Sequence, residues 1–263
     1  MYKLLAIDLD DTTINSERKI TQTVKQAIKK AQQAGVKVMV ATGRGYRGTM
    51  AILDELELTG PTICFAGAEI VDHPTGHTVH TDLMSKELVQ KTIDFAKRHG
   101  VYIQVFQGKD YYFEHPTKYS NRYSEALRFE GIKTDFSDMT LDRVSKTLII
   151  DDDRVQQLYK AAQQELGNIC EISISRTSFL EFSGFGVTKG KALAYLAAQM
   201  QIPREQIIAV GDNIIDLAMM QYAGMGVAVK NASPEILAAA DYICPSNDQD
   251  GVAHVVNHFI LGE

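Results

Sequence analysis

The sequence predicts an α/β protein with a doubly wound parallel sheet and a second α/β domain inserted into it. Short apolar segments, of the kind that form strands buried on both faces, alternate with amphipathic helical segments. The middle of the chain, about 83–182, is richer in tyrosines and charged residues, and none of its strand-like segments ends in an acidic pair. The strands expected for the parallel sheet are 4–9, 36–41, 207–210 and 225–229.

Helices are expected after the first strand and after Lys189. Thr21 is suited to cap the N-terminus of the first helix, and Gly35 is suited to end it. The alanine-rich segment 192–198 predicts the second helix. The buried face of the first helix is predicted by apolar residues at the spacing of one helix face, namely Val24, Ala27, Ile28 and Ala31.

The inserted domain is predicted from the places where the sheet pattern stops and resumes. The pattern of the first domain returns near Lys189. We therefore expect a Rossmann-like core at 1–82 and 185–263 and an inserted α/β domain at 83–184. The elements expected in the insertion are helices at about 86–99 and 152–166 and strands at 102–106, 111–115, 146–150 and 169–174.

The composition is that of a soluble globular protein, with 45% hydrophobic and 23% charged residues among 263. The net charge of −6 argues against a nucleic-acid partner, since proteins that neutralise a phosphate backbone are normally basic. No apolar stretch approaches the roughly 18 residues of a membrane helix, and the N-terminus becomes acidic at Asp8, too early for a signal peptide. Three cysteines without metal-ligand spacing suit a reducing cytosol, so we expect a cytoplasmic protein without a membrane partner.

Polar residues follow all four expected strands of the core. Because ligands of open α/β sheets bind beyond the carboxyl ends of the strands, four polar strand ends predict one convergent site. Asp8 and Asp10 are two residues apart, so in an extended segment both carboxylates emerge on one face. The segments that follow the strands are Asp8-Leu9-Asp10, Thr42-Gly43-Arg44, Gly211-Asp212 and Lys230-Asn231.

The acidic residues in these segments predict a cation site. Asp212 and Asp216 lie four residues apart around a helix start. A single strand-end Asp is usually a solvated turn residue, but carboxylates that gather at one site repel one another and need a cation. An all-oxygen set suits Mg²⁺. A calcium loop of the EF-hand type does not fit, because Thr13 replaces the loop glycine and Lys19 replaces the bidentate glutamate.

A hydroxyl, a glycine and a lysine supply groups that can bind phosphate. Thr42 and Gly43 offer a hydroxyl and a backbone amide at a strand end. Lys189 offers an ammonium group. Taken singly, each is an ordinary turn or a solvated lysine, so the significance of the three lies in their order along the chain.

Together these segments resemble the motifs of the haloacid dehalogenase-like hydrolases, and more narrowly those of the Cof-type sugar-phosphate phosphatases. The family pattern is DxDx[TV] after a strand, Ser or Thr after a second strand, a Lys, and GDxxxD. The resemblance covers essentially the whole chain, and the stretch between the second motif and the lysine is long enough for the family's α/β cap, which selects the substrate. It implies hydrolysis of small phosphorylated metabolites. The motifs match at Asp8, Thr42, Lys189 and Asp212.

The resemblance implies a role for each matching residue. Asp8 would be the nucleophile that forms an aspartyl phosphate, and Asp10 would be the general acid and base. Mg²⁺ would be held by the Asp8 side chain, the Asp10 carbonyl and Asp212. Asp216 would lie nearby and contact the ion directly or through water. The groups implied to bind the phosphoryl oxygens are Lys189, Thr42 and the backbone amides of Leu9 and Gly43.

Two positions depart from the family pattern. Ile215 stands where the family commonly has Asn, and Ala66 stands where the family commonly has the Asn of an Asn-Gly-Ala turn. A hydrogen-bond donor lost at such a place costs on the order of 1–3 kcal/mol, or 10- to 100-fold in rate, so weakened turnover is expected. Asn213 and Asn231 are the candidates to supply an amide in place of Ile215.

The roles of Arg44 and of three histidines are less specific than those of the motif residues. Arg44 either reaches a second anionic group of the substrate or forms a surface ion pair. Three histidines surround a Pro-Thr-Gly turn, and their spacing indicates an exposed hairpin and fits no preferred zinc site. These histidines are His73, His77 and His80.

Other functions stay open at this point. A phosphotransferase or mutase would use the same aspartyl phosphate but pass the phosphoryl group to another hydroxyl. A metabolite-binding protein that has lost catalysis would account for Ala66 and Ile215. A phospho-acceptor signalling domain also uses Asp, Thr and Lys on an α/β sheet, but the inserted domain and the acidic pair argue against it. Sugar phosphates, nucleotide precursors and pyridoxal phosphate are all open as substrates, and no oligomeric state is predicted.

Overall fold

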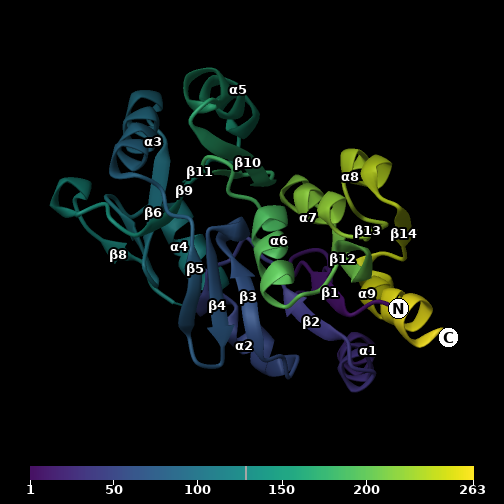
Figure 1. Cartoon of the computed structure of the whole chain (residues 1–263). Coiled ribbons are helices and arrows are strands. Elements are labelled where there is room, and N and C mark those ends of the chain that lie inside the picture. Colours follow the sequence, from purple (N-terminus) through teal and green to yellow (C-terminus); the bar gives the residue numbers. More distant parts are fainter. Residues whose placement is uncertain (128) are drawn as a thin grey trace. The chain divides into compact units, whose positions relative to one another are not determined.

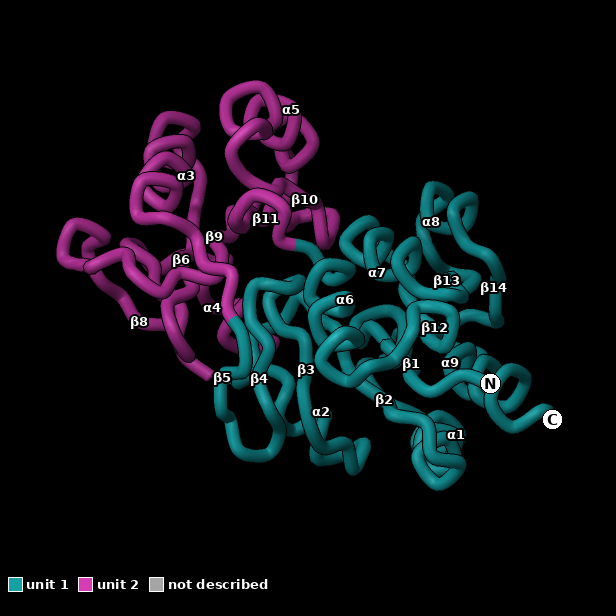
Figure 2. The backbone as a smooth tube through the Cα atoms, viewed as in Figure 1, with its two compact units in different colours: residues 1–80, 188–263 teal, residues 81–187 magenta. Residues whose placement is uncertain are grey.

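The computed structural model describes residues 1–127 and 129–263, which divide into two compact units. Unit 1 comprises Met1–His80 and Thr188–Glu263, and unit 2 comprises Thr81–Val187 (Figure 2). The chain therefore leaves unit 1 once, forms unit 2 and returns. Among the described residues, no helix has the length and apolar character needed to cross a lipid bilayer.

Unit 1 is built on a five-stranded parallel sheet with the order β14-β13-β12-β1-β2 (Figure 1). β1 lies between β2 and β12, and all of its residues are buried, as its apolar sequence predicts. Ile7 lies opposite Val40 and Val210, so these three strands end at the same edge of the sheet. The strands are β1 (Leu4–Ile7), β2 (Lys37–Val40), β12 (Ile207–Gly211), β13 (Met225–Val229) and β14 (Tyr242–Cys244).

Helices alternate with these strands, and the predicted doubly wound α/β core is confirmed. The helices of unit 1 are α1 (Gln22–Gln33), α2 (Met50–Glu55), α6 (Lys189–Gln199), α7 (Leu217–Tyr222), α8 (Pro234–Ala239) and α9 (Gly251–Val255). The Thr21 hydroxyl caps α1 by accepting from the amide of Val24 at 3.2 Å, and Gly35 follows the helix with a φ of 83°. α1 packs against α9 and β2, whereas α6 packs against α7.

A three-stranded sheet with the order β3-β4-β5 follows β2. β3 and β4 are antiparallel, and a parallel bridge between Ala41 and Ile63 joins β3 to the end of β2. The expectation of an exposed hairpin is wrong for His73, which is buried; its ring nitrogens lie 3.0 Å from the Tyr46 hydroxyl and 3.2 Å from an Asp54 carboxylate oxygen. Partners on both nitrogens make this burial tolerable. The strands are β3 (Gly60–Cys64), β4 (Glu69–His73) and β5 (His77–Thr81).

Unit 2 is built on a six-stranded sheet with the order β10-β11-β9-β6-β7-β8, in which β7 and β8 are parallel and the other recorded pairs are antiparallel. The strands are β6 (Tyr102–Gln107), β7 (Asp110–Phe113), β8 (Ile132–Lys133), β9 (Val144–Ile150), β10 (Cys170–Arg176) and β11 (Phe179–Gly184). The helices are α3 (Lys86–His99), α4 (Lys118–Leu127) and α5 (Val155–Leu166). Residues of α3 and α5 share one apolar cluster with residues of β6 and β11, so this unit has its own core.

Short helical turns complete the described chain. Three of them, η1, η2 and η5, follow β2, β3 and β12 and therefore lie next to the strand ends that carry the predicted site. Their bounds are η1 (Tyr46–Gly48), η2 (Phe65–Gly67) and η5 (Ile214–Asp216). The others are η3 (Phe136–Asp138), η4 (Arg204–Gln206), η6 (Asn247–Gln249) and the π-helical η7 (Val256–Leu261).

Candidate active site

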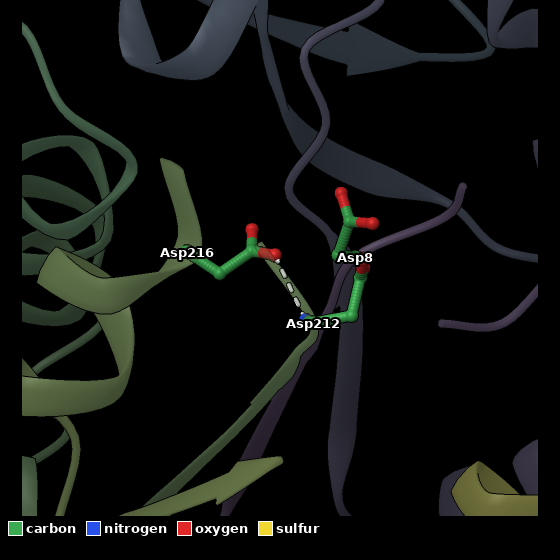
Figure 3. Close-up of side chains that lie close together, drawn as sticks. All are labelled: Asp8, Asp212 and Asp216. Carbon is green, nitrogen blue, oxygen red and sulfur yellow. Dashed lines mark hydrogen bonds between the residues drawn. The ribbon is translucent and has the colours of Figure 1, made fainter. Parts of the chain in front are cut away.

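Carboxylates from distant parts of the sequence meet at the carboxyl edge of the core sheet. Asp8 directly follows β1, Asp212 directly follows β12, and Asp216 ends η5. Each offers a carboxylate oxygen, and these oxygens lie within 4.8 Å of one another (Figure 3). The residue after β1 and two residues of the segment after β12 therefore form one acidic group. Asp8 and Asp216 are buried, and Asp212 is half-buried.

A buried lysine joins two of these carboxylates. Lys189 is the first residue of α6, whose N-terminus is capped by the Thr188 hydroxyl through a hydrogen bond from the amide of Lys191 at 3.1 Å. Its Nζ lies 2.5 Å from Asp8 Oδ1 and 2.5 Å from Asp216 Oδ1, and its side chain is 0% exposed. Burial alone would lower the pKa of this ammonium, but the two carboxylates raise it above its ordinary value. Lys189 is therefore a permanent positive charge within the acidic group.

The acidic group carries more negative charge than the lysine balances. Burial raises the pKa of Asp8 well above its ordinary value, and the charges of Asp216 and Asp212 add to this rise while Lys189 opposes it. Burial, and then the charge of Asp216, raise the pKa of Asp212 to about 7. When ionised, the three carboxylates carry two more charges than the ammonium that pairs with Asp8 and Asp216, so a divalent cation would balance the remaining negative charge. The donor set, made of oxygens only, fits Mg²⁺.

Asp216 also fixes the loop that carries Asp212. Its Oδ2 accepts from the backbone amides of Asp212 at 3.1 Å and Asn213 at 3.0 Å. Gly211 allows this close approach, since a β-carbon at that position would lie 2.4 Å from the β-carbon of Asp216. Asp216 therefore holds both Lys189 and the Asp212 backbone in place.

Asp10 is paired with an arginine from the second strand end. Arg44 donates from Nε to Asp10 Oδ2 and from Nη2 to Asp10 Oδ1, both at 2.7 Å. Arg18 adds a longer contact of 3.4 Å between its Nη1 and Asp10 Oδ1. Arg44 and Asp10 therefore form an ion pair in which both side chains are 22% exposed.

Thr42 and Gly43 follow β2 at the same edge of the sheet. Thr42 is buried, and its Oγ1 accepts from the amide of Arg44 at 3.2 Å. The hydroxyl proton is not used in this hydrogen bond. A β-carbon at Gly43 would lie 3.5 Å from Ile215 Cδ1, so the isoleucine packs beside this glycine.

Comparison with known proteins agrees with this geometry. A sequence profile described as haloacid dehalogenase-like hydrolase matches residues 5–256, nearly the whole chain. The chain belongs to the haloacid dehalogenase-like hydrolase family. The match spans both segments of unit 1 and all of unit 2, so the long insertion is included in the family resemblance.

Two curated relatives match this hydrolase over nearly their full length. A Streptococcus pyogenes relative is 30% identical over 98% of both chains. The chain is also similar to the 5-amino-6-(5-phospho-D-ribitylamino)uracil phosphatase YcsE of Bacillus subtilis, with 29% identity over 98% of this chain and 96% of that protein. A crystal structure of a haloacid dehalogenase-like hydrolase from Bacteroides thetaiotaomicron superposes with a TM-score of 0.87 and 28% identity, over 99% of this chain and 100% of the other. The predicted family, fold class and type of enzyme, a phosphatase, are confirmed.

At its third strand end this hydrolase has a residue in an unfavourable backbone conformation. Ala66 has φ 54° and ψ 26°, the left-handed region that asparagine adopts more readily than alanine. Its amide donates to the carbonyl of Thr42 at 2.9 Å, which ties the turn after β3 to the end of β2. The turn thus keeps the left-handed conformation without the asparagine side chain.

Asn231 of this hydrolase makes two hydrogen bonds to other segments of unit 1. Its Nδ2 donates to the carbonyl of Asp11 at 2.7 Å, and its Oδ1 accepts from the amide of Asn247 at 2.9 Å. Asn231 therefore braces the loop that follows β1.

Sequence reasoning missed three residues that support the site. Thr12 donates to Asp212 Oδ1 at 2.7 Å, and Thr13 donates to the Asp8 carbonyl at 2.6 Å. Gly67 has φ 113°, and a β-carbon there would lie 2.3 Å from the carbonyl oxygen of Thr188, which precedes Lys189. The signal for Thr12 is the threonine of the DxDxT motif and that for Gly67 is the glycine of the Asn-Gly-Ala turn, whereas nothing local to Thr13 indicates its contact.

Proposed function

We propose that this hydrolase is a Mg²⁺-dependent phosphatase of small phosphorylated metabolites that acts through a phosphorylated Asp8. The group of three carboxylates around Lys189 is the observation that supports this proposal most directly. A dianionic phosphate can enter such a site only when positive charge exceeds or balances the carboxylates. Lys189 and a bound cation together supply that charge.

We propose that Mg²⁺ is held by the Asp8 side chain, the backbone carbonyl of Asp10 and Asp212, with Asp216 nearby. Oxygen ligands and retained waters are typical of Mg²⁺ sites. The raised pKa values of Asp8 and Asp212 support this assignment, because they indicate carboxylates that lack a sufficient counter-charge of their own. When bound, the ion would neutralise charge on the phosphoryl oxygens.

The reaction proceeds in two half-reactions at the chain's own side chains. A carboxylate oxygen of Asp8 forms a bond to phosphorus while the bond from phosphorus to the leaving oxygen breaks, and Asp10 gives its proton to that oxygen. An alcohol departs. Water then forms a bond to phosphorus as the bond from phosphorus to Asp8 breaks, and Asp10 takes the water proton. Inorganic phosphate is released, and both aspartates regain their starting state.

Four groups hold the transferring phosphoryl group in this proposal. The Nζ of Lys189 lies 2.5 Å from Asp8 Oδ1, so its positive charge is next to the attacking carboxylate. The Thr42 hydroxyl accepts from a backbone amide and retains its proton for a phosphoryl oxygen. The backbone amides of Leu9 and Gly43 add neutral donors at the strand ends.

We propose that unit 2 is the cap that selects the leaving group. It is a compact unit with its own core, inserted between the Thr42 and Lys189 segments of the site. A relative named as a phosphatase of a phosphorylated ribitylamino-uracil supports a polyhydroxylated leaving group as the first class to test. Sugar phosphates and pyridoxal phosphate complete the candidate set.

Phosphate release from a panel of these metabolites and from p-nitrophenyl phosphate, with Mg²⁺ or with EDTA, tests the proposal. We expect release that requires Mg²⁺ and a loss of at least about a thousandfold in Asp8→Asn, which removes the nucleophile. The matched control is Asp94→Asn on α3, where the carboxylate accepts from Gln90 at 2.8 Å. Wild-type activity in Asp8→Asn or in EDTA would refute the mechanism. Mg²⁺-dependent binding without release would favour the metabolite-binding alternative.

A further inference from the structure

We propose that Arg44 is a positioning residue whose guanidinium orients the Asp10 carboxyl group for proton transfer. This inference rests on the proposed function, which assigns that proton transfer to Asp10. Arg44 contacts both carboxylate oxygens, through Nε and Nη2, at 2.7 Å each. A planar guanidinium bound to both oxygens fixes the plane as well as the position of a carboxyl group, which a single hydrogen bond does not.

Arg44 is itself held at several points. Its amide donates to Thr42 Oγ1 at 3.2 Å, and its carbonyl accepts from the amide of Phe65 at 2.9 Å. Its Nη1 donates to the carbonyl of Gly48, at the end of η1, at 3.3 Å. The Arg44 backbone is therefore held by the segments that follow β2 and β3, and its guanidinium by Gly48, so the position of these segments determines where the guanidinium meets Asp10.

Asp10 needs such an anchor more than Asp8 does. The Asp8 side chain is 7% exposed and contacts the buried Lys189, whereas the Asp10 side chain is 22% exposed and lies on the turn that follows β1. A general acid must lie within about 3 Å of the oxygen that it protonates, and a displacement of about 1 Å can cost a hundredfold in rate. A carboxylate has about four acceptor positions, so the paired arginine is compatible with proton transfer at the others.

The same contacts argue against substrate binding as the main role of Arg44. All three guanidinium nitrogens already donate, two of them to Asp10 and one to Gly48. An arginine that recognises a second anionic group of the substrate would have to give up the paired carboxylate. The two roles therefore make opposite predictions about which substrates are affected when Arg44 is replaced.

The dependence of rate on the leaving group separates these roles. p-Nitrophenolate departs without a proton, whereas the alkoxide of a sugar phosphate needs one. The comparison uses kcat/KM, which reports on formation of the aspartyl phosphate, because the later attack of water is the same for every leaving group. We expect Arg44→Ala to lower kcat/KM less than about tenfold with p-nitrophenyl phosphate and about a hundredfold or more with a sugar phosphate, since general acid catalysis is worth about 10²–10⁴-fold. Asp10→Asn should show the same pattern, and the double variant should lose no more than Asp10→Asn alone. Added guanidinium ion should restore part of the sugar-phosphate activity of Arg44→Ala but not of Asp10→Asn.

Two further variants test the geometry rather than the charge. Arg44→Lys keeps the charge but not the planar pair of donors, so it should resemble Arg44→Ala. Arg18→Gln removes the longer and more exposed contact to the same carboxylate and should stay within about twofold of wild type. An equal loss of kcat/KM with both leaving groups, a rise in KM confined to substrates with a second anion, or a full rescue by lysine would overturn the proposal.

Crystal structures of the wild type and of Arg44→Ala provide a readout that does not depend on activity. We expect the Asp10 side chain to leave its wild-type position or to occupy several rotamers in the variant, while Asp8 and Lys189 stay in place. An unmoved Asp10 would overturn the positioning role even if turnover changed. If the wild type releases no phosphate but Asp10 moves as expected, the proposed function fails and the positioning contact stands.

Discussion

Replacing Lys189 with methionine is the most severe test of the charge balance in the site. Methionine is similar in length but uncharged, so Lys189→Met leaves Asp8 and Asp216 buried without the ammonium that lies 2.5 Å from each. Removing one partner of a buried ion pair typically costs about 3–5 kcal/mol. Because one lysine here serves two carboxylates, we expect a loss of unfolding free energy near the upper end of that range at pH 8 without divalent ions.

The size of this loss should depend on pH. The folded pKa of Asp8 is already above its ordinary value, so the folded state binds more protons than the unfolded state as the pH falls. Without Lys189, which opposes the rise, that pKa moves further up. The variant should therefore be most destabilised relative to wild type at high pH, and the difference should shrink as the pH falls toward the ordinary carboxyl range.

Urea unfolding of the wild type and the variant at pH 5.5 and pH 8, with and without Mg²⁺, measures these effects. Adding Asp8→Asn to Lys189→Met removes one negative charge and should recover part of the loss, as should Mg²⁺. The control is Lys29→Met, which breaks an exposed 2.9 Å pair with Glu57 and should cost no more than about 1 kcal/mol. A large loss in Lys189→Met that neither acid, Mg²⁺ nor Asp8→Asn relieves would show that packing, and not charge balance, explains the lysine.

Three other predictions concern the metal and the strand ends. Protons compete with a cation at Asp212, whose folded pKa is about 7, so the Mg²⁺ affinity measured by calorimetry should rise up to about 30-fold between pH 5.5 and 8; a flat profile would contradict this. Ala66→Asn should raise the unfolding free energy by about 1 kcal/mol and also raise kcat, whereas Ala66→Gly relieves the same left-handed backbone without adding an amide and should leave kcat unchanged. Thr12→Val removes the hydrogen bond that lowers the Asp212 pKa, so the midpoint of the Mg²⁺ affinity profile should move to higher pH, and an unmoved midpoint would exclude this role.

The parallel sheet could be predicted because its signals are local. Fully buried strands are continuous apolar runs, and α1 carries its cap and its stop in Thr21 and Gly35. The sequence pattern did not predict β14 at the edge of this sheet, nor β11 in the sheet of unit 2. β14 has three residues and an exposed Ile243, so it lacks a buried apolar run. β11 contains Glu181, whose burial is compensated by an ion pair of 2.8 Å with Lys146 on β9. A buried charged residue interrupts the apolar pattern by which a strand is predicted, and its distant ion-pair partner cannot be read from the local sequence.

The site was predictable to the extent that strand ends determine it. The rule for ligands at the carboxyl edge identified the carboxylates and the threonine. The partners of these residues were not predictable, because they depend on which strands pair and in what register. Thr12 reaches Asp212 only because β1 and β12 are neighbours that end together. The burial of His73 likewise depends on Tyr46 and Asp54, which come from segments far from it in sequence.

Gly67 sets the separation between a turn and the helix that begins with Lys189. A methyl group there would occupy space within 2.3 Å of the Thr188 carbonyl oxygen, so the turn or the start of α6 would have to move. A shift of α6 would lengthen both contacts of the ammonium at once. In a mutational library, Gly67 should therefore be as intolerant as the acidic motifs themselves, although it has no functional group to lose. Variants of the enzyme designed for new substrates should therefore retain Gly67.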